Sequence, residues 1–155
     1  SFNTKVKSAK MQGCFTLMLG FEARLPLDYQ AALVRGEDIS WISVNSSKPD
    51  RNSATSLLVH STNGWATQHD GLDRNEALQY LLKQTSLVMG QDVNHADHKA
   101  VHQWRYANCS KRTGETYFID HASRSGACGD WLIKGRVEAA FTSGYYIAQD
   151  ILSQL

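Results

Sequence analysis

Two strand-like segments follow one another directly in this chain. Residues 39–44 (ISWISV) alternate in side-chain character as a strand does, and residues 55–60 (TSLLVH) form a second short apolar run. The stretch between them, NSSKPDRNS, consists of turn-forming residues. Because parallel pairing would need a long crossover between the two strands, this spacing predicts an antiparallel hairpin joined by a longish loop.

The other segments extend this pattern. The segment at residues 25–38 fits either a short helix or an extended edge. Further strands are predicted at residues 11–21, 99–107, 116–120 and 125–130, the last ending in a turn. Strands that arrive mostly as hairpins, with helices placed between them, predict an α+β fold with a mostly antiparallel sheet and flanking helices.

Two helices are predicted, at residues 73–89 and 135–152. The first begins with the N-cap Asp73, followed by Glu76 as in a capping box, and ends at Gly90. The second contains Gly144, which costs about 1 kcal/mol relative to alanine inside a helix, so we expect close packing of this helix on a sheet. The residues that form its apolar stripe are Val137, Ala140, Phe141, Gly144, Ala148, Ile151 and Leu152, and this face is expected to be exposed when the chain is separated from its partner domain.

Composition and charge exclude several classes of protein. The 155 residues suit one domain, and a net charge of +1 gives no long-range attraction to nucleic acid or to an anionic membrane. The longest apolar run is too short to span a bilayer, and no signal peptide is seen. Three widely spaced cysteines indicate neither a disulfide framework nor a zinc ribbon. We therefore expect a reducing, cytoplasmic compartment.

Three residue clusters suggest other chemistry without strong support. His95, His98 and His102 have a spacing that could hold a metal, but spacing alone does not show convergence, and no metal site is predicted. Cys128 with His121 could form a nucleophile pair. The remaining candidates, Ser43, Ser46 and Ser47, lack the G-x-S-x-G context of a hydrolase.

The C-terminal segment, residues 128–152, has a strand–turn–helix pattern. Gly129 and Asp130 end a strand, and Gly135 opens the helix. Glycine at the turn would let a ligand approach the backbone, and a helix N-terminus offers unpaired N–H groups to an anionic ligand. An ordinary packed terminal helix explains the same pattern, so the residues alone leave both interpretations open.

Three motifs resemble those of known flavoproteins. The C-terminal segment resembles the flavin-binding signature of the amine oxidase superfamily, in which Gly-Asp is followed by G-x-V-E-G-A and S-G. The corresponding residues are Gly129-Asp130, the stretch 135–140 (GRVEAA) and Ser143-Gly144, with Ala139 where the family often has glycine. Upstream, residues 40–51 (SWISVNSSKPDR) and 102–107 (HQWRYA) resemble motifs of the renalase-like branch of this family.

This resemblance implies a flavin-dependent oxidoreductase that binds FAD. It implies hydride transfer from an amine or a nicotinamide-like donor, such as NAD(P)H, to FAD, followed by reoxidation, with no residue here singled out as catalytic. Asp130 would meet the ribityl or phosphate region, and the helix N-terminus would face the pyrimidine edge of the flavin. The implied cofactor-binding residues are Gly129, Asp130, Trp131, Gly135, Arg136, Val137 and Glu138.

The substrate pocket is expected on the aromatic strands. Trp104 and Tyr106 fall on one face of their strand with His102, and Trp41 lies on another strand. Aromatic residues such as these commonly line pockets, although ordinary packing explains at least two of the four tryptophans. The partner expected in this pocket is a small-molecule substrate.

The same resemblance divides the chain into two parts. Residues 1–124 would form a substrate-side domain, and residues 125–155 a strand and helix that pack on an N-terminal FAD-binding domain. The eleven glycines include no G-x-G-x-x-G fingerprint, so these 155 residues alone are expected to bind FAD weakly or not at all and to be inactive. The exposed apolar face of the last helix is expected to make them self-associate. The alternative is a non-enzymatic α+β ligand-binding or interaction module with a flavoprotein-like shape.

Overall fold

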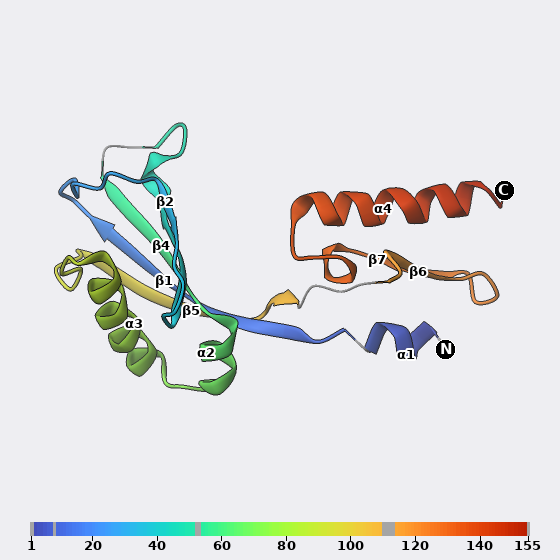
Figure 1. Cartoon of the computed structure of the whole chain (residues 1–155), viewed down its shortest axis with the longest axis horizontal. Coiled ribbons are helices and arrows are strands. Elements are labelled where there is room, and N and C mark those ends of the chain that lie inside the picture. The colour runs from blue at the N-terminus through green and yellow to red at the C-terminus, as the bar shows by residue number, and fades with distance from the viewer. Residues whose placement is uncertain (1, 8, 52–53, 110–113, 155) are drawn as a thin grey trace. The chain divides into compact units, whose positions relative to one another are not determined.

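The computed structural model describes residues 2–7, 9–51, 54–109 and 114–154. The chain divides into two compact units (Figure 1). Residues 13–105 form one, called the sheet unit, and residues 1–12 with 106–155 form the other, called the hairpin unit. Among the described residues, no helix combines the length and the apolar composition needed to cross a bilayer.

The sheet unit is built on a five-stranded sheet with the strand order β2-β3-β4-β1-β5. The strand pairs β2–β3, β3–β4 and β1–β4 are all antiparallel, which confirms the predicted hairpin over residues 39–60 and the mostly antiparallel sheet. The strands are β1 (Met11–Phe21), β2 (Ala31–Leu33), β3 (Ile39–Val44), β4 (Thr55–Ser61) and β5 (His98–Cys109). The ambiguous segment at 25–38 is therefore extended at β2, which is an edge strand, and is not a helix.

Two helices, α2 (Asn63–Gln68) and α3 (Arg74–Met89), contribute to the core that covers one face of this sheet. In β4 alternate side chains from Thr55 to Ser61 are buried, so one face of the strand points into the core. The Asp73 side chain accepts hydrogen bonds from the first-turn amides of α3, and Gly90 ends that helix with φ +61°, as predicted. The residues at the centre of this core are Leu17, Leu19, Ile42, Leu57, Val59, Leu81 and Leu82.

The hairpin unit contains an antiparallel pair of strands and a long helix. β6 pairs with β7, and the register joins Tyr117 to Cys128 and Asp120 to Ser125. Its elements are α1 (Phe2–Lys7), β6 (Tyr117–Asp120), β7 (Ser125–Cys128), the 3-10 turn η2 (Asp130–Leu132) and α4 (Val137–Leu152). The predicted division after residue 124 falls in the turn of this hairpin, so the units divide the chain elsewhere.

The last helix differs from its prediction in its start, and its buried face carries small side chains. It begins at Val137, not at Gly135, and its buried side chains are Ala139, Ser143 and Ile147, spaced four residues apart. The predicted apolar face is exposed, as expected for a helix without its partner domain: Val137 is 91% exposed and Phe141 is 74% exposed. The small side chains of the true inner face give little hydrophobic signal, whereas the stronger apolar pattern lies on the outer face.

The expected close approach at Gly144 is wrong. A Cβ atom added there would have no described atom within 4 Å outside its own helical surroundings. The close approach is instead in the hairpin, where a Cβ on Gly126 would lie 2.7 Å from Cδ1 of Ile147. Glycine in β7 therefore allows α4 to pack closely on this strand.

Candidate functional site

The first turn of α4 has backbone N–H groups that are available to a ligand. Arg136 is the N-cap residue, with an extended backbone, and no side-chain capping hydrogen bond is made there among the described residues. The first bond of the helix runs from Ala140 N to Arg136 O, so the amides of Val137 and Glu138 have no partner within the helix. These N–H groups and the positive end of the helix dipole favour an anionic or electron-rich ligand.

Ser143 connects this helix to the Gly129–Asp130 turn. Its hydroxyl accepts a hydrogen bond from Gly129 N (2.9 Å) and donates one to the carbonyl of Thr116 (2.5 Å), and the residue has no exposed surface. A Cβ on Gly135 would lie 3.7 Å from Oδ2 of Asp130, which places that carboxylate beside the start of α4. The structure therefore brings the separated parts of the C-terminal motif together.

The two glycines of the motif are required by contacts within the chain. Gly129 has φ +156°, and a Cβ there would lie 2.5 Å from Nε1 of Trp131. A Cβ on Gly135 would collide with the side-chain oxygen of Asn108. Trp131 is half-buried and packs edge-on against Phe118, with ring centroids 6.1 Å apart. Glycine at these positions needs no ligand to explain it, and the flavin contacts of both residues stay a prediction.

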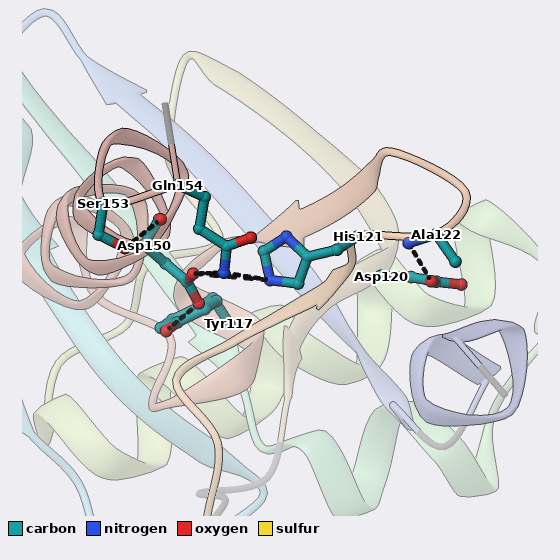
Figure 2. Close-up of polar contacts among 7 residues, drawn as sticks. All are labelled: Tyr117, Asp120, His121, Ala122, Asp150, Ser153 and Gln154. Carbon is teal, nitrogen blue, oxygen red and sulfur yellow. Dashed lines mark hydrogen bonds and ion pairs between the residues drawn. The ribbon is translucent and has the colours of Figure 1, made fainter.

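A polar network fixes the other end of α4 to the hairpin (Figure 2). Tyr117 donates its hydroxyl to Oδ2 of Asp150 (2.8 Å), and this bond raises the pKa of the tyrosine. Nε2 of His121 lies 3.6 Å from Oδ1 of Asp150 and 3.2 Å from Nε2 of Gln154. Since Cys128 is opposite Tyr117 in the register, the structure does not bring it together with His121 as a nucleophile pair.

The sheet unit presents a second candidate surface on the sheet face opposite α2 and α3, called the open face. Trp41 is opposite His60 in the β3–β4 register, and His60 is opposite Thr16 in the β4–β1 register. Nδ1 of His60 lies 3.3 Å from Oγ1 of Thr16, so these two side chains share one face. The three residues therefore form a row across three neighbouring strands.

The fifth strand continues this face. A Cβ on Gly20 would lie 3.2 Å from Cβ of His98, and a Cβ on Gly13 would lie 3.4 Å from the carbonyl of Trp104. From the first contact to the second, the residue number falls along β1 and rises along β5, which indicates that the two strands pair antiparallel. Because side chains alternate along β5, His98, His102 and Trp104 all lie on the same face as Gly20, which is the open face.

Three of the four predicted pocket residues share this open face. Trp41 is 38% and Trp104 is 53% exposed, and the rings of His102 and Trp104 are 4.3 Å apart. Trp41 is on β3, however, with β4 and β1 between it and β5, so it lies at the far side of the face. Tyr106 belongs to the hairpin unit and is 79% exposed.

The open face also carries residues that the sequence did not single out. Nδ1 of His60 lies 3.6 Å from Sγ of Cys14 as well as near Thr16. Burial lowers the pKa of His60, and it raises the pKa of the Cys14 thiol. The only sequence signal for His60 was its alternation with the buried residues of its strand, which assigns a face but no function.

A cavity of about 670 Å³ lies at one end of the sheet unit. The turn after β3 forms one wall, where Ser46 Oγ accepts a hydrogen bond from Ser56 N (3.1 Å) and Ser47 Oγ donates to Val44 O (2.8 Å). These bonds give the serines of the NSSKP stretch a role in shaping the turn. The cavity is lined, among others, by Gly20, Asn45, Asp50, Arg51, Asp97 and His98.

The histidines of the possible metal cluster are engaged separately. His95 packs on Phe21 with ring centroids 5.4 Å apart, His98 faces Gly20, and His102 packs on Trp104. Within the described part of the chain, no three histidine, cysteine or acidic side chains are grouped so that they could hold a metal ion.

Comparisons with known proteins agree with this architecture. Residues 2–152 match the family described as flavin-containing amine oxidoreductase. The fold is similar to the crystal structure of a protein assigned as a protoporphyrinogen oxidase from Exiguobacterium sp. 255-15, with a TM-score of 0.61 and 13% sequence identity. That similarity covers 73% of this chain but 26% of the other chain, so the present chain spans about a quarter of its length.

Proposed function

The chain belongs to the family of flavin-containing amine oxidoreductases, and on that premise we propose that it forms part of an FAD-dependent oxidoreductase. The family match over residues 2–152 is the observation that carries this proposal. The geometry supports it with two separate surfaces of different chemistry, the start of α4 in the hairpin unit and the open face in the sheet unit.

The start of α4 fits a flavin, and FAD when bound supplies the two-electron acceptor. The uncapped amides of Val137 and Glu138 would donate to an electron-rich edge of the ring, and Arg136 would add a positive charge nearby. Asp130 would accept hydrogen bonds from hydroxyl groups of the cofactor. The remaining proposed cofactor residues, which shape this turn, are Gly129, Trp131 and Gly135.

The open face would bind the hydride donor. Trp104 and His102 offer a flat aromatic surface, and Trp41 offers a second one across the sheet. This arrangement supports an amine or a nicotinamide-like donor, including NAD(P)H, because such molecules combine a flat or apolar part with a hydrogen-bonding group. The renalase-like motif at residues 102–107 lies on β5, and the one at residues 40–51 begins on β3 and continues into the turn after it. Both motifs support the same donor class.

The exposed side of α4 would pack on an FAD-binding domain of the same protein. Val137, Phe141 and Tyr145 follow one another at four-residue intervals and are exposed in this chain. A stripe of this kind is typical of a helix that is covered in the complete protein. A cytoplasmic location is part of the same proposal.

Absorbance spectra of the full-length protein and of these 155 residues, purified side by side, test the proposal. We expect flavin bands in the full-length protein and none in the isolated chain. Asp130→Asn in the full-length protein should lower its flavin content, whereas Asp28→Asn, at an exposed position of the sheet unit, should not. A full-length protein that is colourless and takes up no added FAD would refute the proposal and favour the binding-module alternative.

A further inference from the structure

His60 is placed at the centre of the row that crosses the open face. It is opposite Trp41 on β3 and opposite Thr16 on β1, and its side chain is half-buried between these strands. Neighbouring side chains of opposite residues lie about 5 Å apart in an antiparallel pair. An aromatic surface and a polar ring edge are thus side by side at this point of the face.

The two nitrogen atoms of the His60 ring have different surroundings. Nδ1 is near Oγ1 of Thr16 (3.3 Å) and Sγ of Cys14 (3.6 Å). Among the described residues, none makes a hydrogen bond to Nε2. Thr16 and Cys14 are themselves buried, so the ring is held on its Nδ1 side by groups that have little freedom to move.

We propose that His60 binds the hydride donor by a hydrogen bond from Nε2 to the edge substituent of a planar ring, with nicotinamide carboxamide as the chemical class. This inference rests on the proposed function, because it names a donor-binding residue on the open face. Thr16 and Cys14 are positioning residues that orient the imidazole, and Trp41 supplies the neighbouring aromatic surface.

The charge state of the imidazole suits such a ligand. Burial lowers the pKa of His60, so the ring is neutral near pH 7 and can donate or accept one hydrogen bond at Nε2. A carboxamide has both a carbonyl oxygen and an N–H group, so it can satisfy either tautomer. A neutral ring edge also avoids the cost of placing a charge beside an apolar ring.

Two substitutions in the full-length protein separate a binding role from a structural one. The amide of His60→Gln reaches to the place of Nε2, whereas the shorter amide of His60→Asn reaches only to the place of Nδ1. If His60 binds the donor through Nε2, Gln should retain binding and Asn should lose it. If His60 serves only Thr16 and Cys14, Asn should be the better tolerated replacement.

The measurement is NADH binding, monitored by the quenching of tryptophan fluorescence. The thermal midpoint and the flavin content of each variant are recorded in parallel. We expect His60→Asn to weaken NADH binding about tenfold, as for loss of one hydrogen bond in a partly dry site, and His60→Gln to stay within about threefold. His95→Asn, at an exposed loop position off the open face, is the matched control and should bind as the wild type does.

Equal binding by both variants and the wild type, or no NADH binding by the wild type, would overturn the inference. Flavin content distinguishes this failure from failure of the proposed function. If the full-length protein is yellow but its NADH binding does not depend on His60, the flavoenzyme proposal stands and the role of His60 is refuted. If the full-length protein is colourless but its NADH binding depends on His60, the binding role of His60 stands and the flavoenzyme proposal is refuted.

Discussion

Ser143 shows at the scale of one residue how the C-terminal motif is held together. Its hydroxyl accepts a hydrogen bond from Gly129 N and donates one to the carbonyl of Thr116, and Ser143 itself has no solvent exposure. Ser143→Ala leaves both groups without this partner, and each buried unpaired group costs about 1–3 kcal/mol. We therefore expect a clear loss in the free energy of unfolding, measured by urea denaturation.

Thr142→Ala is the matched control for that substitution. Thr142 precedes Ser143 in the same helix, but its hydroxyl donates to the carbonyl of Glu138 one turn earlier and bonds no other described residue. A surface change of this kind usually stays within about 0.5 kcal/mol. Equal losses from Ser143→Ala and Thr142→Ala would show that the buried hydroxyl does not join the helix to the turn.

The pKa of His60 makes stability depend on pH in a defined direction. Burial lowers this pKa from its usual value of 6.5, so the unfolded chain binds the proton more strongly than the folded chain does. The contribution of the neutral ring is fully present above pH 6.5 and is lost as the pH falls through the folded pKa. Among the residues that the structure describes, the titratable group in contact with the ring is Cys14, whose own pKa is raised, so it stays uncharged over this range.

Unfolding free energies of the wild type and of His60→Gln between pH 5 and 8 check this direction. The difference between the two should shrink as the pH falls below 6.5, because only the wild type has an imidazole at this position to be protonated. The other histidines are common to both proteins and cancel in the difference. A difference that is constant with pH would contradict the lowered pKa.

At the scale of whole elements, local signals predicted the ends of α3 but not the presence of α2. Asp73 and Gly90 act through side-chain and backbone preferences that a short stretch of sequence contains. The six residues of α2 include Gly64 and have only the cap of Thr62 to mark their start. Its stability comes from packing of Trp65 against His69 and Tyr80, contacts that depend on the folded core.

The open face could be predicted only in part. Alternation along each strand shows that two faces exist, but which face α2 and α3 cover is decided by the packing of the whole unit. His60 contacts Thr16 and Cys14 across 44 and 46 residues of chain, so this cluster needs the strand order to be found. The motif at Gly129 could be predicted from the sequence because its parts lie close together along the chain. The role of Ser143 could not, because it depends on how α4 packs in the folded chain.

The exposed stripe of α4 predicts the behaviour of these 155 residues in isolation. Phe141 and Tyr145 stack with ring centroids 6.4 Å apart on the outer side of the helix. An apolar surface of this kind promotes association between copies at high concentration. We expect concentration-dependent self-association in sedimentation velocity, and we expect Phe141→Glu to reduce it strongly.

Gln149→Glu controls for the added charge in that experiment. Gln149 is also exposed on α4 but carries no apolar surface, so its substitution should leave the association largely unchanged. A strictly monomeric wild type at high concentration would contradict the prediction. An equal effect of both variants would show that repulsion between charges, not loss of apolar contact, controls the association.

At the scale of the whole molecule, the two proposed functional surfaces belong to different compact units. The residues proposed to bind the flavin are in the hairpin unit, and the open face proposed to bind the donor is in the sheet unit. Each unit has contacts of its own that define its structure, such as the Ser143 bonds in one and the packing around Leu81 in the other. Because a compact unit with its own core can unfold separately, we expect damage to one unit to leave the other largely intact.

The four tryptophans allow this expectation to be measured directly. Trp131 is in the hairpin unit, whereas Trp41, Trp65 and Trp104 are in the sheet unit, so their indole N–H resonances report on the units separately during a urea titration. Leu81→Ala removes a fully buried side chain and should cost about 2–5 kcal/mol in the sheet unit, with the Trp131 transition almost unmoved. Ser143→Ala should shift the urea transition of Trp131 and leave the transitions of the other three tryptophans unchanged. If either substitution instead moves all four transitions together, the chain unfolds as one cooperative body, and the open face and the α4 start would then have to be treated as parts of one stability unit.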